Sequence, residues 1–504
     1  MRGLLVAGTA SEVGKSVVVA GLCRWLARRG IKAAPFKAQN MALNSAVTRD
    51  GAEIGRAQAA QAAAARVAPE AAMNPILLKP SGERTSQVVV MGRAVTELDA
   101  GAYQQLKPRL RTVVLDALAS LADRFEVVIC EGAGSPAEIN LRAGDLVNMG
   151  LARAAGLPVV VVGDIDRGGV FASLFGTLAL LDAADQALVA GFLVNKFRGD
   201  PAVLAPGLDQ LGQLTGRPVL GVLPWRRGLR LDAEDSVELE TPVDGPVPAR
   251  GADVLQVAVV RLGWLSNFTD LDPLAAEPGV TVRFTVSPAD VLGADLAVVP
   301  GTKATVTDLA WLRRMGLDRA LAERAARGLP TLGICGGYQL FGERIVDRVE
   351  SNAGEVAGLG LLPVETVFQA AKMLGNPVGT APWLGGVPAA GYEIHHGRTR
   401  AFGGAPVLES DDGDLGCRSG SVVGVAWHGI FEGDAFRRAF LGWVAAERGL
   451  DWLAGNRPFA AVREARLDAL GDLIAEHIDT AALDRLLDQG APPGLPFVPP
   501  GPPS

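Results

Sequence analysis

The stretch GTASEVGKS (residues 8–16) follows an apolar run that begins at Leu4 and precedes a helical pattern, SVVVAGLCRWLARRG. A strand, a glycine-containing loop and a helix in this order are typical of a nucleotide-binding α/β domain. The usual pattern, G-x-x-x-x-G-K-[ST], places its first glycine at residue 9, where the chain has Thr9; Gly8 comes one position early. The stretch is therefore either a nucleotide site with an unusual start or a chance Gly-Lys-Ser.

Three residues of this loop supply groups that bind ATP. A phosphate-binding loop needs backbone N–H groups that converge on phosphate oxygens at a helix N-terminus. Gly14 stands where a side chain would obstruct the phosphates, Lys15 can reach the β- and γ-phosphates, and Ser16 can bind Mg²⁺. The alternative, an ordinary strand–turn–helix, is disfavoured by the strand and helix that flank the loop. We therefore predict a site for ATP and Mg²⁺ that includes Gly8 and Thr9.

Apolar runs rich in β-branched residues recur through the first half of the chain, separated by helical stretches. They are EVVIC, PVVVVGDID, ALVAGFLVN and RPVLGVLPW. Strands that are apolar on both faces and alternate with helices are typical of a parallel sheet. We predict an α/β domain over residues 1–235, with its ligands at the carboxyl edge of the sheet.

Polar residues at the ends of these strands are candidates for the same site. Lys37 ends the second predicted strand, and Asn195 ends a later one, where it could bind the base of ATP. An acid is also needed near Mg²⁺, and both Asp50 and Glu131 are candidates beside Ser16. Glu131 is better placed because it directly follows an apolar strand. Any single one of these residues could instead belong to an ordinary loop.

The rest of the chain divides by composition. Residues 236–252 are rich in proline, glycine and acidic residues and predict a linker. A second α/β pattern over 253–449 contains the strand candidates VLQVAVVRL, ADLAVVPG, LPTLGIC and VVGVAWHG. A helical extension over 450–488 follows, and the proline-rich tail over 489–504 is expected to be disordered.

The second half contains a candidate nucleophile. In LPTLGICGGYQLFG (329–342) a strand runs through Gly-x-Cys-Gly-Gly into a helix, which places Cys335 on a sharp turn. Backbone N–H groups at Gly336 and near Gly301, in VVPGTKATVTD, could hold a developing oxyanion. The alternative is a buried structural cysteine at a glycine turn.

A cysteine nucleophile needs a base, and the chain has only four histidines. His428, in VVGVAWHGIFEGD, ends a predicted strand and precedes a glycine, which suits a base at the edge of the sheet. His477 falls in the C-terminal helical pattern. The remaining two lie in GYEIHHGRT (391–399), a polar cluster that could contact substrate. Cys335 and His428 are therefore the predicted catalytic pair.

Charge and composition exclude several classes of protein. The net charge of −7 disfavours nucleic acid as a partner. No apolar run approaches the roughly 20 residues that span a bilayer, so no membrane partner is expected. The four cysteines form no C-x-x-C pair, which favours a reducing compartment and a cytoplasmic location.

These motifs occur in an order that resembles one known family. The phosphate loop, PFKAQNMALNS, EGAGSPAEINL, DIDRGGVFA, NKFRGD, PGTKATVTDL, GICGGYQLFG and WHGIF follow one another as in cobyric acid synthases of the CobQ type. The resemblance covers roughly residues 3–445 and extends to the offset Gly-Thr start of the loop. It implies a dethiobiotin-synthetase-like ATP domain followed by a class I glutamine amidotransferase domain with a flavodoxin-like α/β fold.

The resemblance also implies a reaction. Cys335 would attack the side-chain amide of L-glutamine, His428 would move protons, and ammonia would leave. ATP would phosphorylate a carboxylate of a corrinoid, with Lys15 and Lys37 stabilising the transferred charge, and ammonia would displace the phosphate. The family's acceptor is adenosylcobyrinic acid a,c-diamide, amidated at its b, d, e and g side chains in cobalamin biosynthesis. Ammonia must stay away from water, which predicts a protected path or a transient closure between the domains.

One departure from the amidotransferase pattern and three alternatives remain at this point. Many class I amidotransferases have a glutamate two residues after the catalytic histidine, where this chain has Ile430; Glu432 or Glu393 could substitute for it. The chain could also resemble the synthase that amidates the a and c carboxylates. It could be a ParA/MinD-like regulatory ATPase with a non-catalytic second domain, or carry a silent amidotransferase-like domain that binds an effector. The sequence predicts no oligomeric state.

Overall fold

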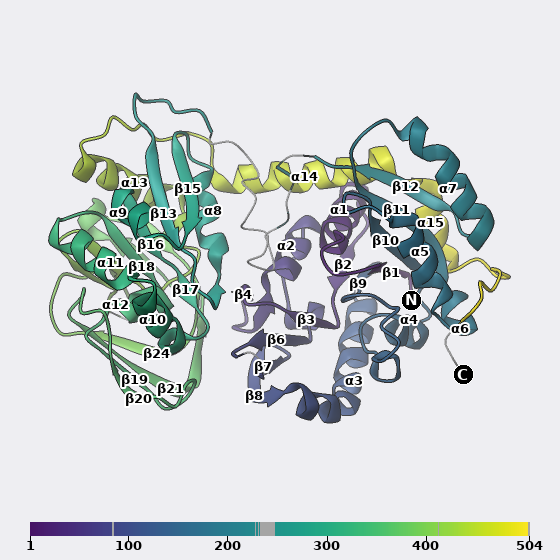
Figure 1. The fold of residues 1–504 in the computed structure, drawn as a ribbon, viewed down its shortest axis with the longest axis horizontal. Helices are drawn as coiled ribbons and strands as arrows, with labels where there is room; N and C mark the ends of the chain where they lie inside the picture. Colours follow the sequence, from purple (N-terminus) through teal and green to yellow (C-terminus); the bar gives the residue numbers. More distant parts are fainter. Residues whose placement is uncertain (83–84, 227, 230, 232–246, 412, 502–504) are drawn as a thin grey trace.

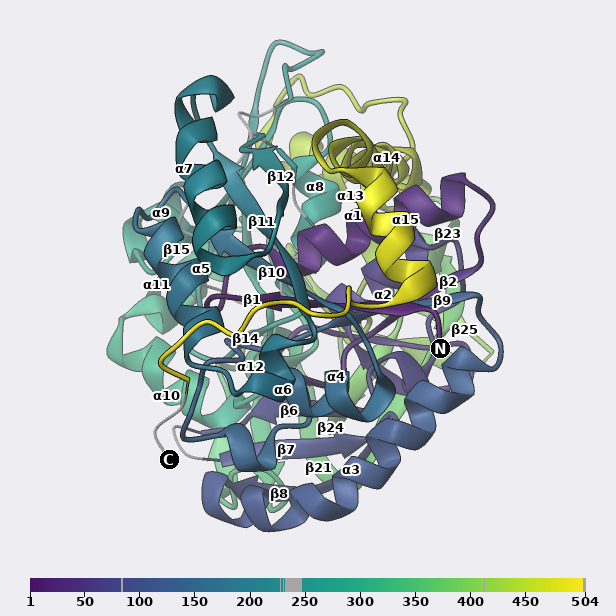
Figure 2. The same cartoon turned by 90° about the vertical axis from the view of Figure 1, so that its right-hand side faces the viewer.

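The computed structural model shows two α/β halves that pack against each other, with the C-terminal helices lying across both (Figures 1 and 2). It describes residues 1–82, 85–226, 228–229, 231, 247–411 and 413–501. Most of the linker predicted at 236–252 therefore falls outside the described residues. None of the helices in the described ranges is long and apolar enough to cross a membrane.

The first half, the synthetase domain, is built on a six-stranded sheet in the order β12-β11-β10-β1-β9-β2. Every pair in this sheet is parallel, as the sequence predicted. The strands are β1 (Gly3–Gly8), β2 (Ala33–Phe36), β9 (Val127–Glu131), β10 (Val159–Asp164), β11 (Val189–Phe197) and β12 (Val219–Pro224). The central strands β1, β9 and β10 are buried along their whole length, which explains their unbroken apolar sequences.

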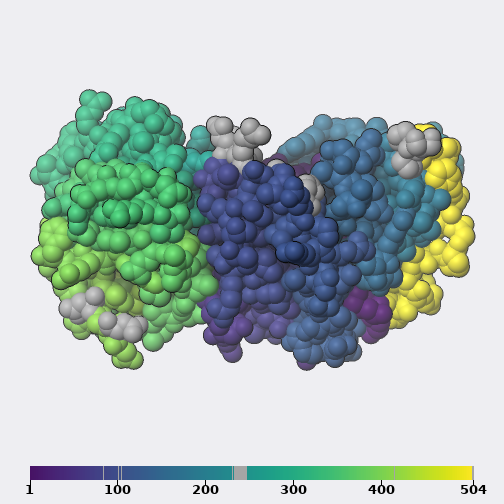
Figure 3. Space-filling model, turned by 90° about the horizontal axis from the view of Figure 1, so that it is seen from below, coloured from purple at the N-terminus to yellow at the C-terminus, as the bar shows by residue number. Residues whose placement is uncertain are grey.

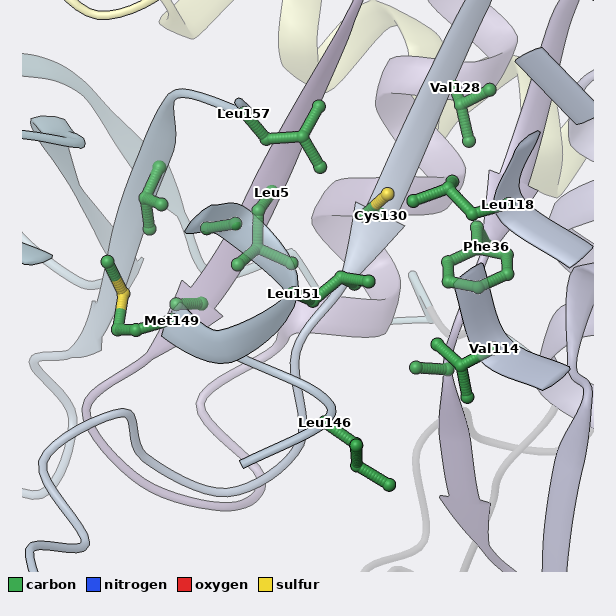
Figure 4. Packing of buried hydrophobic residues seen from close by; sticks show 14 of the residues in the cluster. Leu5, Phe36, Val114, Leu118, Val128, Cys130, Leu146, Met149, Leu151 and Leu157 are labelled. Carbon is green, nitrogen blue, oxygen red and sulfur yellow. The ribbon is translucent and has the colours of Figure 1, made fainter. Parts of the chain in front are cut away.

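Helices cover both faces of this sheet. They are α1 (Lys15–Arg28), α2 (Arg56–Ala64), α3 (Ala100–Ala122), α4 (Met149–Ala155), α5 (Val170–Ala179), α6 (Ala183–Gln186) and α7 (Pro201–Thr215). Figure 4 shows part of the hydrophobic core on one face of the sheet. The side chains drawn there include Leu5, Phe36, Cys130 and Leu151, and all four are buried. This core fixes the strand ends that carry the predicted ATP site.

Two small sheets extend the synthetase domain toward the second half (Figure 1). One has the order β3-β6-β7-β8, and the other is the hairpin β4-β5. Their strands are β3 (Gln39–Met41), β4 (Ser45–Val47), β5 (Glu53–Gly55), β6 (Ile76–Pro80), β7 (Thr85–Val90) and β8 (Arg93–Asp99). In the space-filling view of Figure 3, this early part of the chain lies directly against the second half.

The second half, the amidotransferase domain, contains a six-stranded sheet in the order β15-β13-β16-β18-β28-β27, parallel except for its last pair. Its strands are β13 (Leu255–Val260), β15 (Val280–Thr285), β16 (Leu296–Val299), β18 (Thr331–Ile334), β27 (Cys417–Ser419) and β28 (Val422–Val425). Its helices are α8 (Asp272–Ala275), α9 (Pro288–Gly293), α10 (Thr305–Arg314), α11 (Leu317–Ala326), α12 (Gly336–Phe341) and α13 (Asp434–Arg448).

Smaller strands complete this domain. The pair β14 (Leu265–Ser266) and β17 (Gly301–Thr302) is antiparallel and lies beside the parallel sheet's carboxyl edge. The sheet β20-β19-β21-β24 comprises β19 (Arg344–Asp347), β20 (Gly354–Ala357), β21 (Val364–Gly375) and β24 (Glu393–Ala401). The last comprises β22 (Val378–Ala381), β23 (Val387–Ala390), β25 (Leu408–Ser410) and β26 (Gly413–Leu415).

The C-terminal segment returns to the synthetase domain. After α13, helix α14 (Phe459–His477) packs along α1, and α15 (Thr480–Gln489) follows it (Figures 1 and 2). The Arg24 side chain of α1 is buried, and its Nε donates to Asp468 of α14 at 2.8 Å. The helical extension thereby ties the two domains together from the outside.

The described part of the proline-rich tail, residues 490–501, packs against the synthetase domain, whereas the sequence predicted a disordered tail over 489–504. Val498 is buried, and its backbone N–H donates to Oε1 of Gln186 at 2.8 Å while its carbonyl accepts from the same amide at 2.9 Å. The Arg217 guanidinium also donates to the Pro496 carbonyl. Composition alone does not reveal these contacts with Gln186 and Arg217, because they join segments that are far apart in the sequence.

Candidate active sites

The phosphate loop lies between β1 and α1, as predicted. Gly14 has φ 97°, and a Cβ there would lie 2.1 Å from Nδ2 of Asn195, so both the backbone conformation and the space require glycine. A Cβ at Gly8 would in turn lie 3.0 Å from Nζ of Lys15. The Lys15 ammonium is buried and donates to the carbonyl of Ala10 at 2.8 Å. The early glycine thus makes room for the lysine beside the end of the strand.

Glu131 is the centre of a buried polar cluster at the end of β9. Its Oε1 accepts from the Ser16 hydroxyl at 2.9 Å and from the Lys37 ammonium at 2.8 Å, and its Oε2 accepts from Gln61 of α2 at 2.6 Å. Burial raises the pKa of Glu131, but the Lys37 ammonium and these hydrogen bonds hold it below its usual range. The carboxylate is therefore ionised beside the loop.

These groups fit a magnesium ion chemically. A hydroxyl and a carboxylate oxygen face each other at 2.9 Å next to the loop lysine. Mg²⁺ binds through such hard oxygen ligands and completes its shell with water and phosphate oxygens. Ser16 and Glu131 are the residues that would hold it.

Cys335 occupies the turn between β18 and α12. Its φ of 49° lies in the left-handed region, which is strained for a residue with a side chain. A Cβ at Gly337 would lie 1.9 Å from the Val299 carbonyl, and one at Gly336 would lie 2.8 Å from the Thr302 amide nitrogen. Both glycines are therefore needed for the turn to pack against the neighbouring strand end, and the turn presents the thiol at the sheet edge.

His428 and Asp270 complete a buried triad with Cys335. Nδ1 of His428 lies 2.7 Å from Oδ2 of Asp270, whose Oδ1 accepts from the Gly429 N–H at 2.8 Å. The Cys335 thiol lines the same cavity as this imidazole and is close enough to shift its pKa. Burial lowers the pKa of His428, but Asp270 and Cys335 raise it to about 10. Burial raises the pKa of Cys335, and the His428 cation brings it below its usual value.

The raised pKa of His428 and the lowered pKa of Cys335 favour a thiolate–imidazolium pair. The thiolate is the nucleophilic form of cysteine. Gly301 lies against the same imidazole, since a Cβ there would be 2.8 Å from Cε1 of His428. Tyr392 stacks on the ring from another side, with centroids 5.4 Å apart. The arrangement can attack a carbonyl carbon and return a proton to a leaving amine.

A cavity opens onto the thiol and extends to the domain boundary. Its lining includes Cys335, His428, Lys303, Glu350 and His395 of the amidotransferase domain, together with Lys79 of β6 in the synthetase domain. The polar cluster GYEIHHGRT therefore does reach the site, and Glu393 lies 3.4 Å from Nε2 of its first histidine. The synthetase domain forms part of the cavity wall.

Comparison with known proteins identifies both halves. Residues 4–238 match the CobQ/CobB/MinD/ParA nucleotide-binding domain, and residues 256–436 match the CobB/CobQ-like glutamine amidotransferase domain. The chain is 60% identical to a cobyric acid synthase of Frankia casuarinae, over 99% of each chain. It is also 60% identical to one of Streptomyces coelicolor, over 100% of this chain and 99% of that protein.

The chain belongs to the cobyric acid synthase family. It is a glutamine-dependent ligase that carries out amidation in cobalamin biosynthesis. The ParA/MinD-like regulatory reading is not favoured, because the family match covers the whole chain and the second domain contains an assembled triad. The family resemblance that the sequence motifs indicated is thus confirmed.

The structure gives a different third member of the triad from those considered in the sequence. Glu432 pairs with Arg56 at 2.7 Å and Arg463 at 2.8 Å, and Glu393 lies beside His395. Asp270 performs the role instead, from a 3-10 turn (Phe268–Leu271) after β14. No local pattern joins Asp270 to His428, because 158 residues separate them.

Two of the predicted ATP-site residues make contacts that the sequence did not indicate. Asp50 lies in the turn of the β4-β5 hairpin, where it accepts from the Thr48 hydroxyl at 2.5 Å; within the described ranges no hydrogen bond or ion pair joins it to Glu131. The structure therefore does not bring Asp50 to the phosphate loop. Asn195 does reach the loop, but its amide donates to the Val13 carbonyl at 2.8 Å and holds the backbone. Its contact with the base stays a prediction.

Proposed function

We propose that this enzyme converts adenosylcobyrinic acid a,c-diamide to adenosylcobyric acid by amidating the b, d, e and g carboxylates, using one ATP and one L-glutamine for each. One observation supports this proposal most strongly. Lys79, which belongs to the domain with the phosphate loop, forms part of the wall of the cavity that contains the Cys335 thiol. Ammonia released at the thiol is thereby formed next to the synthetase domain, where a carboxylate would be activated.

In the amidotransferase domain, the Cys335 thiolate attacks the side-chain amide carbon of glutamine. The carbonyl oxygen becomes an oxyanion, and in this proposal the backbone N–H groups near Gly336 and Gly301 stabilise it. His428 donates its proton to the departing nitrogen, ammonia leaves, and a thioester remains on the sulfur. Water then cleaves the thioester with the imidazole as base, and glutamate leaves. Asp270 keeps the imidazole in the orientation and tautomer that this cycle needs.

In the synthetase domain, a corrinoid carboxylate oxygen attacks the γ-phosphorus of ATP, and ADP leaves. Ammonia then attacks the acyl carbon of the acyl phosphate. The bond to phosphate breaks, inorganic phosphate leaves, and the amide remains. In this proposal Lys15 and Lys37 neutralise the charge on the transferred phosphoryl group, which is the main requirement of this chemistry. Ser16 and Glu131 would hold Mg²⁺, which supplies further neutralisation when it is bound.

The partners in this proposal are small molecules: ATP, L-glutamine and a corrinoid. The acidic net charge of −7 gives no support to a nucleic-acid partner. The absence of a disulfide among the four cysteines is consistent with a cytoplasmic enzyme.

The direct test is incubation of the enzyme with ATP, Mg²⁺, amide-¹⁵N-glutamine and candidate corrinoids, followed by mass spectrometry. The proposal predicts ¹⁵N in the a,c-diamide substrate at each of the b, d, e and g positions. Labelling of cobyrinic acid at its a and c positions instead would assign the enzyme to the other corrinoid amidation. No label in any corrinoid would reject the substrate assignment.

A further inference from the structure

A group of buried charged side chains lies where the cavity of Cys335 meets the boundary between the two domains. Lys79 of β6 in the synthetase domain and Lys372 of β21 in the amidotransferase domain both bind the carboxylate of Glu53 in β5. Nζ of Lys79 lies 2.7 Å from Oε1, and Nζ of Lys372 lies 2.5 Å from Oε2. Glu53 is fully buried, and both lysines are nearly so. One carboxylate therefore joins two cations that come from different domains.

The lysines and carboxylates at the domain-boundary end of the cavity do not balance in charge. Lys79 and Lys372 both line it, while Glu53 lies behind them. A third lysine of the lining, Lys303, is paired with Glu350. Three ammonium groups thus face two carboxylates, and one positive charge is left. A buried uncompensated charge is costly unless a counterion is supplied, so this end of the cavity favours an anionic group of a ligand.

The donors of both lysines also point to a ligand. An ammonium group has three N–H donors. For Lys79 the described acceptors are Glu53 and the Ser45 hydroxyl, the latter at 2.8 Å. For Lys372 they are Glu53 and the Gln87 amide oxygen, at 3.4 Å. Within the part of the chain that the structure describes, each lysine thus has one donor direction left at the cavity.

Hydrogen bonds between the two domains position this end of the cavity. The Ser45 backbone N–H of the β4-β5 hairpin donates to Oδ1 of Asn267 at 2.9 Å, and Asn267 itself lines the cavity. The Asn376 amide donates to the Thr48 carbonyl of the same hairpin, also at 2.9 Å. These bonds run from each domain to the other, so the position of Lys79 relative to the thiol depends on docking of the two domains.

We propose that Lys79 and Lys372 together bind the α-carboxylate of glutamine. The inference rests on the proposed use of glutamine at Cys335. The carboxylate places a negative charge beside the two lysines and offers an acceptor to each, and a bond between charged groups is among the stronger hydrogen bonds in proteins. Because Lys79 belongs to the synthetase domain, glutamine is recognised across the domain boundary, and the cavity is complete only in the docked enzyme.

The test uses Lys79→Met and Lys372→Met in the full-length enzyme. Each variant leaves one lysine on Glu53, so the buried carboxylate keeps a partner. Ammonia release is measured with L-glutamine and with L-glutamine methyl ester, in which the α-carboxylate is neutral. Both variants should raise the KM for glutamine about 10- to 100-fold, the range expected for loss of a charged hydrogen bond. The KM for the ester should change less than about threefold.

Two controls make the result decisive. Lys32→Met removes an exposed lysine that is remote from the cavity, and it should leave both KM values unchanged. Amidation supported by added ammonia, which bypasses glutamine binding, is the reference activity. An unchanged KM for glutamine, or an equal rise for glutamine and its ester, would overturn the proposal. An equal loss of ammonia-supported amidation would also overturn it, because the lysines would then serve docking or folding. Failure of the proposed function is a separate result: the unaltered enzyme would amidate no corrinoid from either nitrogen source.

Discussion

Replacing Asp270 with asparagine tests the triad with little change in side-chain size. Asp270 is the group that, with Cys335, raises the pKa of His428 to about 10 against the lowering effect of burial. Without that carboxylate, burial favours a neutral imidazole at pH 7, and the Cys335 thiolate loses the cation that stabilises it. An asparagine amide can also donate to Nδ1, which selects the wrong tautomer. The corresponding change in a serine protease costs about 10⁴ in kcat, so we expect glutamine-supported turnover to fall about 10²- to 10⁴-fold.

The assay compares glutamate formation, ammonia-supported amidation and the pH dependence of alkylation by iodoacetamide. In Asp270→Asn the acid limb of alkylation should move to higher pH, because loss of the imidazolium raises the pKa of Cys335. Ammonia-supported amidation should remain. Asp272→Asn, two residues along, is the matched control and should change glutaminase activity less than about threefold. The reasoning is refuted if Asp270→Asn keeps glutaminase activity while Glu393→Gln or Glu432→Gln abolishes it.

Three further predictions concern the synthetase domain and the domain contact. Gly14→Ala places a methyl group 2.1 Å from Nδ2 of Asn195, so calorimetry should show ATP affinity reduced at least about tenfold, and unchanged affinity would contradict the loop geometry. Lys37→Met should lower ammonia-supported amidation at least about 100-fold through loss of phosphoryl charge neutralisation; a decrease limited to glutamine-supported turnover would contradict this role. Arg56→Met removes one of the cations paired with Glu432. The free energy of unfolding, measured by urea titration, should fall by about 1–3 kcal/mol. An unchanged midpoint would show that this contact between the domains contributes nothing to stability.

Local patterns were sufficient to predict both domains and most of their catalytic groups. The offset loop could be predicted as a nucleotide site because a strand and a helix, β1 and α1, flank it. Its early glycine has a physical reason, because a Cβ at Gly8 would crowd the side chains of Val13 and Lys15. Cys335 and His428 could be predicted because each ends a strand and adjoins glycine. In these cases the signal lies within a few residues, where backbone geometry restricts the choice of amino acid.

The remaining site residues depend on contacts between distant segments, which one sequence does not reveal. Asp270 follows no motif, although a glutamate position after His428 is filled by Ile430, a sign that the carboxylate had to come from elsewhere. Gln61 reaches Glu131 only because α2 packs on the phosphate-loop helix. Lys79 has no sequence signal of its own, since its role depends on how the two domains dock.

The central claim is that Cys335 supplies ammonia to a carboxylate activated in the other domain. Cys335→Ala tests it most directly, with ATP, Mg²⁺ and adenosylcobyrinic acid a,c-diamide, and with either ¹⁵N-glutamine or ¹⁵N-ammonia as the nitrogen source. In this variant the label from glutamine should be lost, and labelling from ammonia should continue. Equal labelling from both sources would contradict the assignment of Cys335 as the nucleophile.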